Sequence, residues 1–210
     1  MLPDAGTLLL FMTAALALNV TPGPDMLYVV ARSVGEGRAA GIISALGIAA
    51  GTIVHTLAVA LGLAGLLRAV PVAFEIVKWL GAAYLVWLGV RALLRSGTVS
   101  TNEQLAPATR GGIFRQGMLT NVLNPKVALF FLAFLPQFVD PERGPVALQM
   151  ITLGILFNIQ GTLVNILVAV LASGASAWSR RRFGESALMR RVTGVMFIGL
   201  GVRLALTERR

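Results

Sequence analysis

Two ionisable residues, Asp25 and Lys126, stand beside prolines inside long apolar runs of this chain. A charge at the centre of a membrane helix costs about 2.5–3.5 kcal/mol on the insertion scale, so such residues usually have a functional or pairing role. Asp25 is therefore a candidate acceptor for an ammonium group or a proton, and it could also cap a restarting helix. Lys126 is a candidate partner for a substrate carboxylate or for Asp25.

Three further ionisable residues in apolar runs could move protons. His55 is a candidate proton relay near neutral pH, or a side chain hydrogen-bonded between helices. Glu75 and Lys78 are three residues apart, which favours an internal ion pair and leaves an outer gate or proton step as the alternative. The candidates for proton coupling are thus Asp25, His55, Glu75 and Lys78.

Proline interrupts two of the apolar runs in similar sequence contexts. The segments are 19–25 (Asn-Val-Thr-Pro-Gly-Pro-Asp) and 121–126 (Asn-Val-Leu-Asn-Pro-Lys). Proline removes the hydrogen bond to the carbonyl four residues earlier, so Pro22, Pro24 and Pro125 free the carbonyls of Leu18, Val20 and Asn121. We expect Gly23 to let the backbone turn sharply between its two prolines.

Free carbonyls and a restarted helix N-terminus together suit a zwitterion, although a plain kink packed against its neighbours is the alternative. Asp25 lies seven residues before Arg32, and Asn124 lies nine residues after Arg115. At 1.5 Å per residue, both breaks are roughly 10–14 Å from the cytoplasmic boundary and can meet there. The expected substrate-binding residues are Thr21, Pro22, Gly23, Pro24, Asp25, Asn121, Asn124, Pro125, Lys126 and Asn158.

Small and polar residues mark two other helix faces. Asn158, Gly161, Thr162 and Asn165 share one helical face, which could line a solute path or hold helices together. The Gly47/Gly51 pair has GxxxG spacing, which favours close helix packing. Such small-residue faces suggest a homodimer.

The amino-acid composition indicates that the apolar runs lie in a lipid bilayer. Of 210 residues, 56% are hydrophobic and only 13% are charged, whereas soluble domains carry about a quarter charged residues. With a mean hydropathy of +0.80, we expect an all-α, polytopic membrane bundle. The expected spans are 5–31, 40–66, 71–94, 114–138, 146–172 and 192–207. The last is weak because Arg191 and Arg203 bracket it closely, so a five-span chain is the alternative.

Arginine placement predicts the orientation. Eleven arginines fall in the first, third and fifth connections and five on the opposite side, which places those three connections in the cytoplasm and both termini outside. The polar third connection divides the chain into a first three-helix repeat (1–95), a cytoplasmic linker (96–113) and a second three-helix repeat (114–210). Three spans per half make the two repeats inverted, with the first and fourth helices broken. Asp4 and the long first run predict a retained helix in place of a signal peptide.

Several functions are excluded or disfavoured. With no cysteine, one histidine and nine acidic residues, we expect no cofactor, no metal site and no thiol-disulfide electron carrier, and we find no hydrolase constellation. The net charge of +9 comes from runs beside the spans, such as 180–182, so we expect contact with membrane lipid and no nucleic acid. Efflux of a metal ion and a purely structural role remain the alternatives to small-solute transport.

Several motifs resemble the LysE/RhtB family of amino-acid exporters. They are 21–25 (Thr-Pro-Gly-Pro-Asp), 37–41 (Gly-Arg-Ala-Ala-Gly), 74–85 (Phe-Glu-Ile-Val-Lys-Trp-Leu-Gly-Ala-Ala-Tyr-Leu), 121–126 and 134–138 (Phe-Leu-Pro-Gln-Phe). The resemblance implies no enzyme activity and export of amino acids or close derivatives from a bacterial cytoplasm, across the inner membrane, by proton antiport. The homoserine/threonine branch is the closer one. Asn158 stands where some relatives carry an acidic residue, which leaves Asp25 and Glu75 as acidic candidates.

Overall fold

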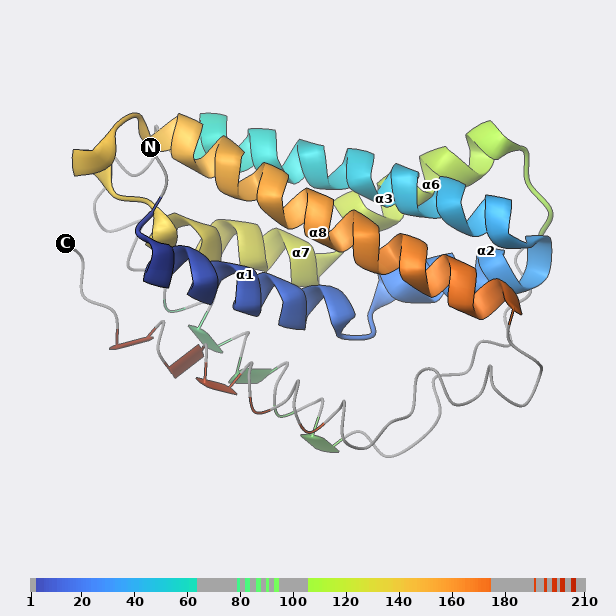
Figure 1. Ribbon diagram of the computed structural model, residues 1–210, viewed down its shortest axis with the longest axis horizontal. Coiled ribbons are helices and arrows are strands. Elements are labelled where there is room, and N and C mark those ends of the chain that lie inside the picture. Colours follow the sequence, from blue (N-terminus) through green and yellow to red (C-terminus); the bar gives the residue numbers. More distant parts are fainter. Residues whose placement is uncertain are drawn as a thin grey trace.

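The computed structural model describes residues 3–63 and 106–174, with isolated positions at 79, 82–83, 86–87, 90, 93–94, 191, 195, 198–199, 201–202 and 205–206. The elements in this part of the chain are all helical (Figure 1). The α-helices are α1 (Ala5–Val20), α2 (Pro24–Glu36), α3 (Arg38–Ala58), α6 (Arg110–Val122), α7 (Pro125–Leu129) and α8 (Val146–Gly174). Short π-helical turns η1 (Val59–Leu63) and η2 (Phe130–Phe134), and 3-10 turns η3 (Leu135–Phe138) and η4 (Pro141–Arg143), extend or connect them.

Four of the expected spans fall within the described residues. The helix that continues from α3 to Gly62 has 25 residues and α8 has 29, and both are long and apolar enough to cross a membrane. The first and fourth helices are broken, as predicted. α1 and α2 meet at 50°, and α6 meets the continuation Pro125–Phe138 at 47°. The expected spans 71–94 and 192–207, with Glu75 and Lys78, lie largely or wholly outside the described residues, so the number of spans and the repeat symmetry stay predictions.

Two boundaries differ from the sequence expectation. The first broken helix continues to Glu36 instead of residue 31, because the polar residues after 31 are still held in α2 by contacts described below. α6 begins at Arg110, inside the expected linker 96–113, because Thr109 caps it by accepting a hydrogen bond from the backbone N–H of Gly112.

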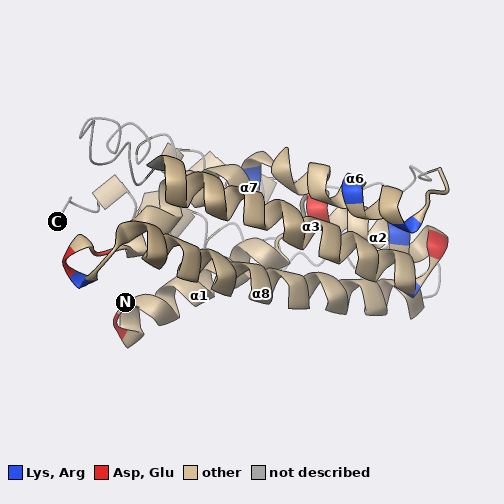
Figure 2. Ribbon diagram, turned by 90° about the horizontal axis from the view of Figure 1, so that it is seen from above, with Lys and Arg blue, Asp and Glu red and all other residues tan. Residues whose placement is uncertain are grey.

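Charged residues lie mostly at the two ends of the described bundle, with only a few coloured turns between them (Figure 2). The outer faces between those ends carry exposed leucines, such as Leu9, Leu61 and Leu163. An apolar outer band of this kind matches the hydrocarbon layer of a membrane. The chain is a multi-pass membrane protein.

A phenylalanine cluster fixes the second half of the broken fourth helix. It joins α1, η2, η3 and α8 through Phe11, Phe130, Phe131, Phe134, Phe138 and Phe157. The rings of Phe11 and Phe138 meet edge to face at 5.2 Å, and those of Phe130 and Phe157 lie 5.0 Å apart. In lipid, helices associate by packing because the solvent is equally apolar, so interlocked rings of this kind hold the elements around the break.

The Gly47/Gly51 pair brings α3 against α6, as predicted for close packing. A Cβ atom at Gly47 would lie 2.2 Å from the carbonyl oxygen of Phe114, and one at Gly51 would lie 2.7 Å from that of Met118. Gly117 repeats the arrangement from the other side, with a Cβ atom 2.8 Å from the carbonyl oxygen of Ser44. Since α6 occupies this face within the chain, the pair gives no support to a homodimer.

Gly37 alone connects α2 to α3. Its φ of 88° and ψ of 178° lie in a region that is almost exclusive to glycine. The chain therefore reverses direction between two helices within a single residue. α8 crosses the bundle in contact with α1, α2 and α3 (Figure 1).

Candidate functional site

The two helix breaks meet, as the sequence predicted. The side-chain amide of Asn121 at the end of α6 donates a 2.8 Å hydrogen bond to Oδ2 of Asp25 at the start of α2. Asp25 is buried. It lies in the first turn of α2, and the N-cap position is taken by Gly23, so the expectation that Asp25 caps the helix is wrong. A carboxylate in the first turn still interacts favourably with the helix dipole.

Lys126, at the second break, makes a further contact with the first break. Its ammonium group donates hydrogen bonds to the carbonyl oxygens of Leu18, at 3.0 Å, and Thr21, at 2.9 Å. The Leu18 carbonyl is one of those that proline frees at the first break. Among the described residues the ion pairs in direct contact are Arg32–Glu36 and Arg143–Asp140, so the charges of Lys126 and Asp25 lie more than 4 Å apart.

Gly23 gives space to a neighbouring side chain and makes no sharp turn. Its φ of −159° and ψ of −175° are extended values that any residue adopts, so the expected conformational role is wrong. A Cβ atom at this position would lie 3.1 Å from Nζ of Lys126 and 3.3 Å from its Cε. The residue is small because the lysine side chain passes directly over the break.

The freed carbonyl of the second break is satisfied by a histidine and by the backbone N–H of Asn124, which donates to it at 2.9 Å. Nε2 of His55 lies 3.0 Å from the carbonyl oxygen of Asn121, the oxygen that Pro125 frees. Because a carbonyl only accepts, Nε2 must carry the proton in this contact. Asn124 then caps α7, its Oδ1 accepting a 3.0 Å hydrogen bond from the backbone N–H of Lys126.

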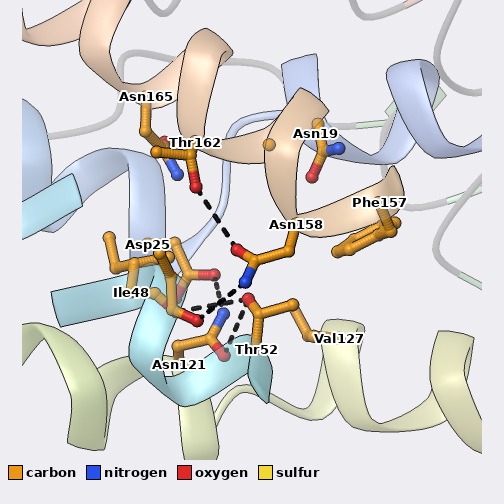
Figure 3. Close-up of a pocket in the computed structure, with 12 residues that line it drawn as sticks. Asn19, Asp25, Ile48, Thr52, Asn121, Val127, Phe157, Asn158, Thr162 and Asn165 are labelled. Carbon is orange, nitrogen blue, oxygen red and sulfur yellow. Dashed lines mark hydrogen bonds between the residues drawn. The ribbon is translucent and has the colours of Figure 1, made fainter. Parts of the chain in front are cut away.

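A cavity lies beside the meeting point and holds about 250 Å³ of empty space, part of it open to the outside. Only about 20 Å³ of it can hold the centre of a water-sized sphere, which is room for about one water molecule, so a larger solute enters only when the surrounding helices move apart. Figure 3 shows polar side chains from α2, α3, α6 and α8 directed toward one another. The lining residues are Asn19, Asp25, Ile48, Ala49, Thr52, Asn121, Val127, Phe157, Asn158, Gly161, Thr162 and Asn165.

Two polar atoms of the lining residues have no hydrogen-bond partner in the described part of the chain. They are Oδ1 of Asp25 and Nδ2 of Asn19, and both are buried. An unsatisfied buried polar group costs about 1–3 kcal/mol, so a ligand that satisfies it recovers that energy. Oδ1 can accept from an ammonium group, and Nδ2 can donate to an oxygen atom. A bound solute could therefore make one contact with a negatively charged acceptor, Oδ1 of Asp25, and one with a neutral donor, Nδ2 of Asn19.

The polar face of α8 lines the cavity and also holds two helices together. Asn158, Gly161, Thr162 and Asn165 all line the cavity. Asn158 also holds helices together, because its Nδ2 donates a 3.2 Å hydrogen bond to the carbonyl oxygen of Ala49 in α3. The Thr162 hydroxyl donates at 3.3 Å to Oδ1 of Asn158 and orients that amide.

Of the expected binding residues, Asp25, Asn121 and Asn158 line the cavity. The other expected residues build the two breaks around it, namely Thr21, Pro22, Gly23, Pro24, Asn124, Pro125 and Lys126. Sequence reasoning missed Asn19 and Thr52. Thr52 precedes His55 by three residues and shares its helix face, and Asn19 opens the first broken segment, so both signals were present.

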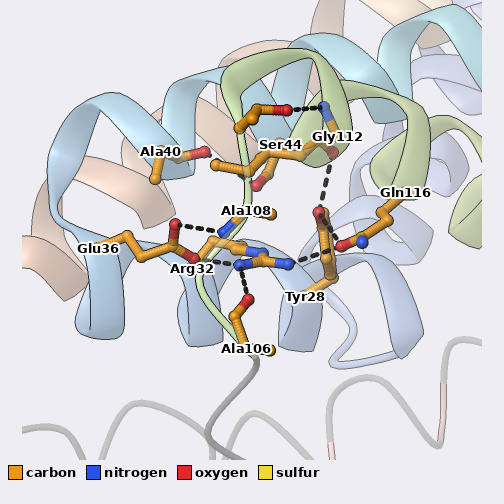
Figure 4. Close-up of polar contacts among 11 residues, drawn as sticks. Tyr28, Arg32, Glu36, Ala40, Ser44, Ala106, Ala108, Gly112 and Gln116 are labelled. Atoms are coloured by element: carbon orange, nitrogen blue, oxygen red, sulfur yellow. Dashed lines mark hydrogen bonds and ion pairs between the residues drawn. The ribbon is translucent and has the colours of Figure 1, made fainter.

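Arg32 corrects a sequence expectation. The arginine pattern places it in the first cytoplasmic connection, but it lies inside α2 with 2% of its surface exposed. Its guanidinium contacts Glu36, donates at 3.0 Å to the carbonyl oxygen of Ala106, and donates at 2.6 Å to Oε1 of Gln116 (Figure 4). It also stacks over the Tyr28 ring at 5.6 Å. Arg32 therefore ties α2 to the start of α6, and the arginine excess of the cytoplasmic side survives its removal from the count.

Replacing Arg32 with leucine is expected to lower the free energy of unfolding by about 3 kcal/mol, since removing one partner leaves buried acceptors unpaired. Thermal unfolding of the purified protein in detergent measures the loss. Arg143→Leu is the matched control, because that ion pair with Asp140 is about half exposed on both sides and its loss should change stability by less than about 1 kcal/mol. Equal effects for the two variants would contradict the structural role of Arg32.

Long apolar helices, two of them broken, surround a small polar cavity, an arrangement that is common in membrane carriers. The chain belongs to the LysE type translocator family, whose model matches residues 16–208. It is a translocator and not an enzyme. It is 30% identical over 195 residues to the homoserine/homoserine lactone efflux protein of Salmonella typhimurium, covering 93% of this chain and 94% of the relative.

Other relatives agree in length. An uncharacterized membrane protein of Pseudomonas aeruginosa is 36% identical over 189 residues, covering 88% of each chain. The membrane protein YrhP of Bacillus subtilis is 27% identical over 210 residues, covering 96% of this chain and 99% of the relative. No solved structure matches the chain.

Proposed function

We propose that this protein exports amino acids or close derivatives, of the homoserine or threonine type, from the bacterial cytoplasm across the inner membrane. The name of the Salmonella typhimurium relative supports an efflux role. The observation that carries the proposal is the buried Oδ1 of Asp25, which has no partner among the described residues and belongs to a cavity-lining side chain. It is a suitable acceptor for the ammonium group that all such solutes share.

The other residues that line the cavity favour a solute whose side chain is uncharged. The polar residues other than Asp25 are amides and hydroxyls, and the free Nδ2 of Asn19 is a donor for a carboxylate, ester or hydroxyl oxygen. A basic amino acid would bring a second cation, and the described lining holds no second carboxylate for it. These features support a homoserine- or threonine-like solute over lysine.

We propose that Asp25 also couples export to the proton gradient. One carboxylate oxygen cannot hold a proton and an ammonium group together, so a proton that enters from outside would release the solute there. His55 is a candidate for the relay, since it contacts the backbone of Asn121, whose side chain donates to Asp25. Glu75 and Lys78, which lie outside the described residues, stay candidates for proton coupling.

We further propose that the halves 1–95 and 114–210, joined by a cytoplasmic linker at 96–113, form inverted repeats around the cavity. The similar bends of 50° and 47° in the first and fourth helices support this arrangement. Breaks at corresponding positions of two repeats are characteristic of carriers in which the solute site opens to each side in turn.

The test is solute efflux from cells that are fed dipeptides containing threonine or homoserine, with and without this protein. We expect faster loss of the labelled amino acid when the protein is present, and collapse of the proton gradient should abolish the difference. A lysine dipeptide is the matched comparison and should show a smaller effect. If no amino acid leaves faster, amino-acid export is wrong, and efflux of a metal ion or of another small solute is the function to test next.

A further inference from the structure

The ammonium group of Lys126 is held by the backbone of another helix and not by a carboxylate. Its two hydrogen-bond acceptors are the carbonyl oxygens of Leu18 and Thr21 at the end of α1. Carbonyls at a helix C-terminus carry the negative end of the helix dipole, so they favour a cation. Gly23 leaves the space for the lysine side chain at the same point, because a Cβ atom there would come within 3.1 Å of Nζ.

We propose that the first helix break is a binding site for a monovalent cation and that the chain itself supplies the occupant as the Lys126 ammonium group. In many carriers, unwound backbone carbonyls of a broken helix coordinate a sodium ion from solution. Here a tethered cation takes that position. It holds the end of α1 against the start of α7 without an ion from outside.

The proposal has two physical consequences. A tethered ammonium cannot be lost to the medium, so the break keeps its geometry whatever the salt, and export needs no sodium ion. Removal of the lysine side chain leaves two carbonyl acceptors and an empty space, and a free cation of suitable shape can fill it. Small molecules do enter cavities that are created by truncating a buried side chain.

The test uses Lys126→Ala with n-propylammonium, which carries the four non-hydrogen atoms that this substitution removes beyond Cβ. Purified wild type and variant are unfolded thermally in lipid nanodiscs, with propylammonium chloride or tetramethylammonium chloride at equal concentration. Tetramethylammonium has the same charge but no N–H donor. We expect propylammonium to raise the Tm of the variant by a few degrees and to leave that of the wild type unchanged.

The functional arm uses proteoliposomes. We expect Lys126→Ala to slow solute transport by about tenfold or more, because it loses two charge-assisted hydrogen bonds, and propylammonium to restore part of the rate. Gln160→Leu is the matched control, since Gln160 also donates to an α1 carbonyl, that of Met12, from α8. It should stay near the wild-type rate and show no response to propylammonium.

Several outcomes would overturn the proposal. They are equal effects of the two ammonium salts, an equal Tm shift in the wild type, and full activity of Lys126→Ala without added cation. If that variant cannot be purified folded, wild-type transport with choline in place of sodium decides, and a loss of transport there refutes the tethered cation. Only the transport measurements rest on the proposed function. The Tm arm needs no transported solute, so a wrong solute and a wrong cation site give different results.

Discussion

Asp25→Asn is expected to slow export by about ten- to a hundredfold while the protein still inserts in the membrane. The asparagine keeps the size of the side chain and can still accept from Asn121, whose Nδ2 donates to Oδ2 at 2.8 Å in the native protein. It removes the negative charge that would hold an ammonium group, and a charge-assisted hydrogen bond contributes about 1.5–3 kcal/mol. Efflux of labelled threonine, normalised to the amount of protein in the membrane, measures the effect.

Asp140→Asn is the matched control for this substitution. Asp140 caps η4 through Oδ1 and pairs with Arg143, about half exposed and away from the cavity. Asparagine is an equally good capping residue, so the control should export at the native rate. Normal efflux in Asp25→Asn would remove Asp25 from the mechanism, whereas equal losses in both variants would point to a general effect of lost charge.

Gly47→Ala is expected to destabilise the fold by about 3 kcal/mol or more, although it adds a single methyl group. That methyl carbon would lie 2.2 Å from the carbonyl oxygen of Phe114, and backbone atoms cannot rotate away as a side chain can. α3 and α6 must separate, and α6 carries Asn121 to the cavity. Both thermal stability in detergent and efflux should therefore fall.

Gly35→Ala is the corresponding control. Gly35 lies in α2, and no atom lies within 4 Å of the Cβ position there. Alanine is the better helix former by about 1 kcal/mol, so this variant should be as stable as the native protein or slightly more stable. If Gly47→Ala behaved in the same way, the close approach of α3 and α6 would be wrong.

The sequence predicts the breaks well because proline acts locally. Pro22 and Pro125 remove hydrogen bonds to Leu18 and Asn121 whatever the rest of the chain does, and the bends of 50° and 47° follow. The meeting of the breaks was also predicted, from their similar distances to Arg32 and Arg115, although the burial of Arg32 in α2 means that this residue does not mark the membrane boundary. The small residues at 47 and 51 likewise indicated close packing through their spacing alone.

The partners of the buried charges were not predictable from spacing. Lys126 follows the second break, but its acceptors belong to α1, more than a hundred residues earlier in the chain. Arg32 looks like a boundary arginine because it ends an apolar run. Its burial depends on residues 106–116, which fold over it and supply its acceptors. Such contacts are set by tertiary structure, which the pattern of residue types along one helix does not contain.

Gly37 has a consequence for movement in the membrane. A one-residue connection in a glycine-only conformation leaves α2 and α3 no slack, so they behave as a single stiff hairpin. Asp25 on one arm and Thr52 and His55 on the other then travel together. We expect any opening of the cavity toward one side of the membrane to move these three side chains together relative to α8.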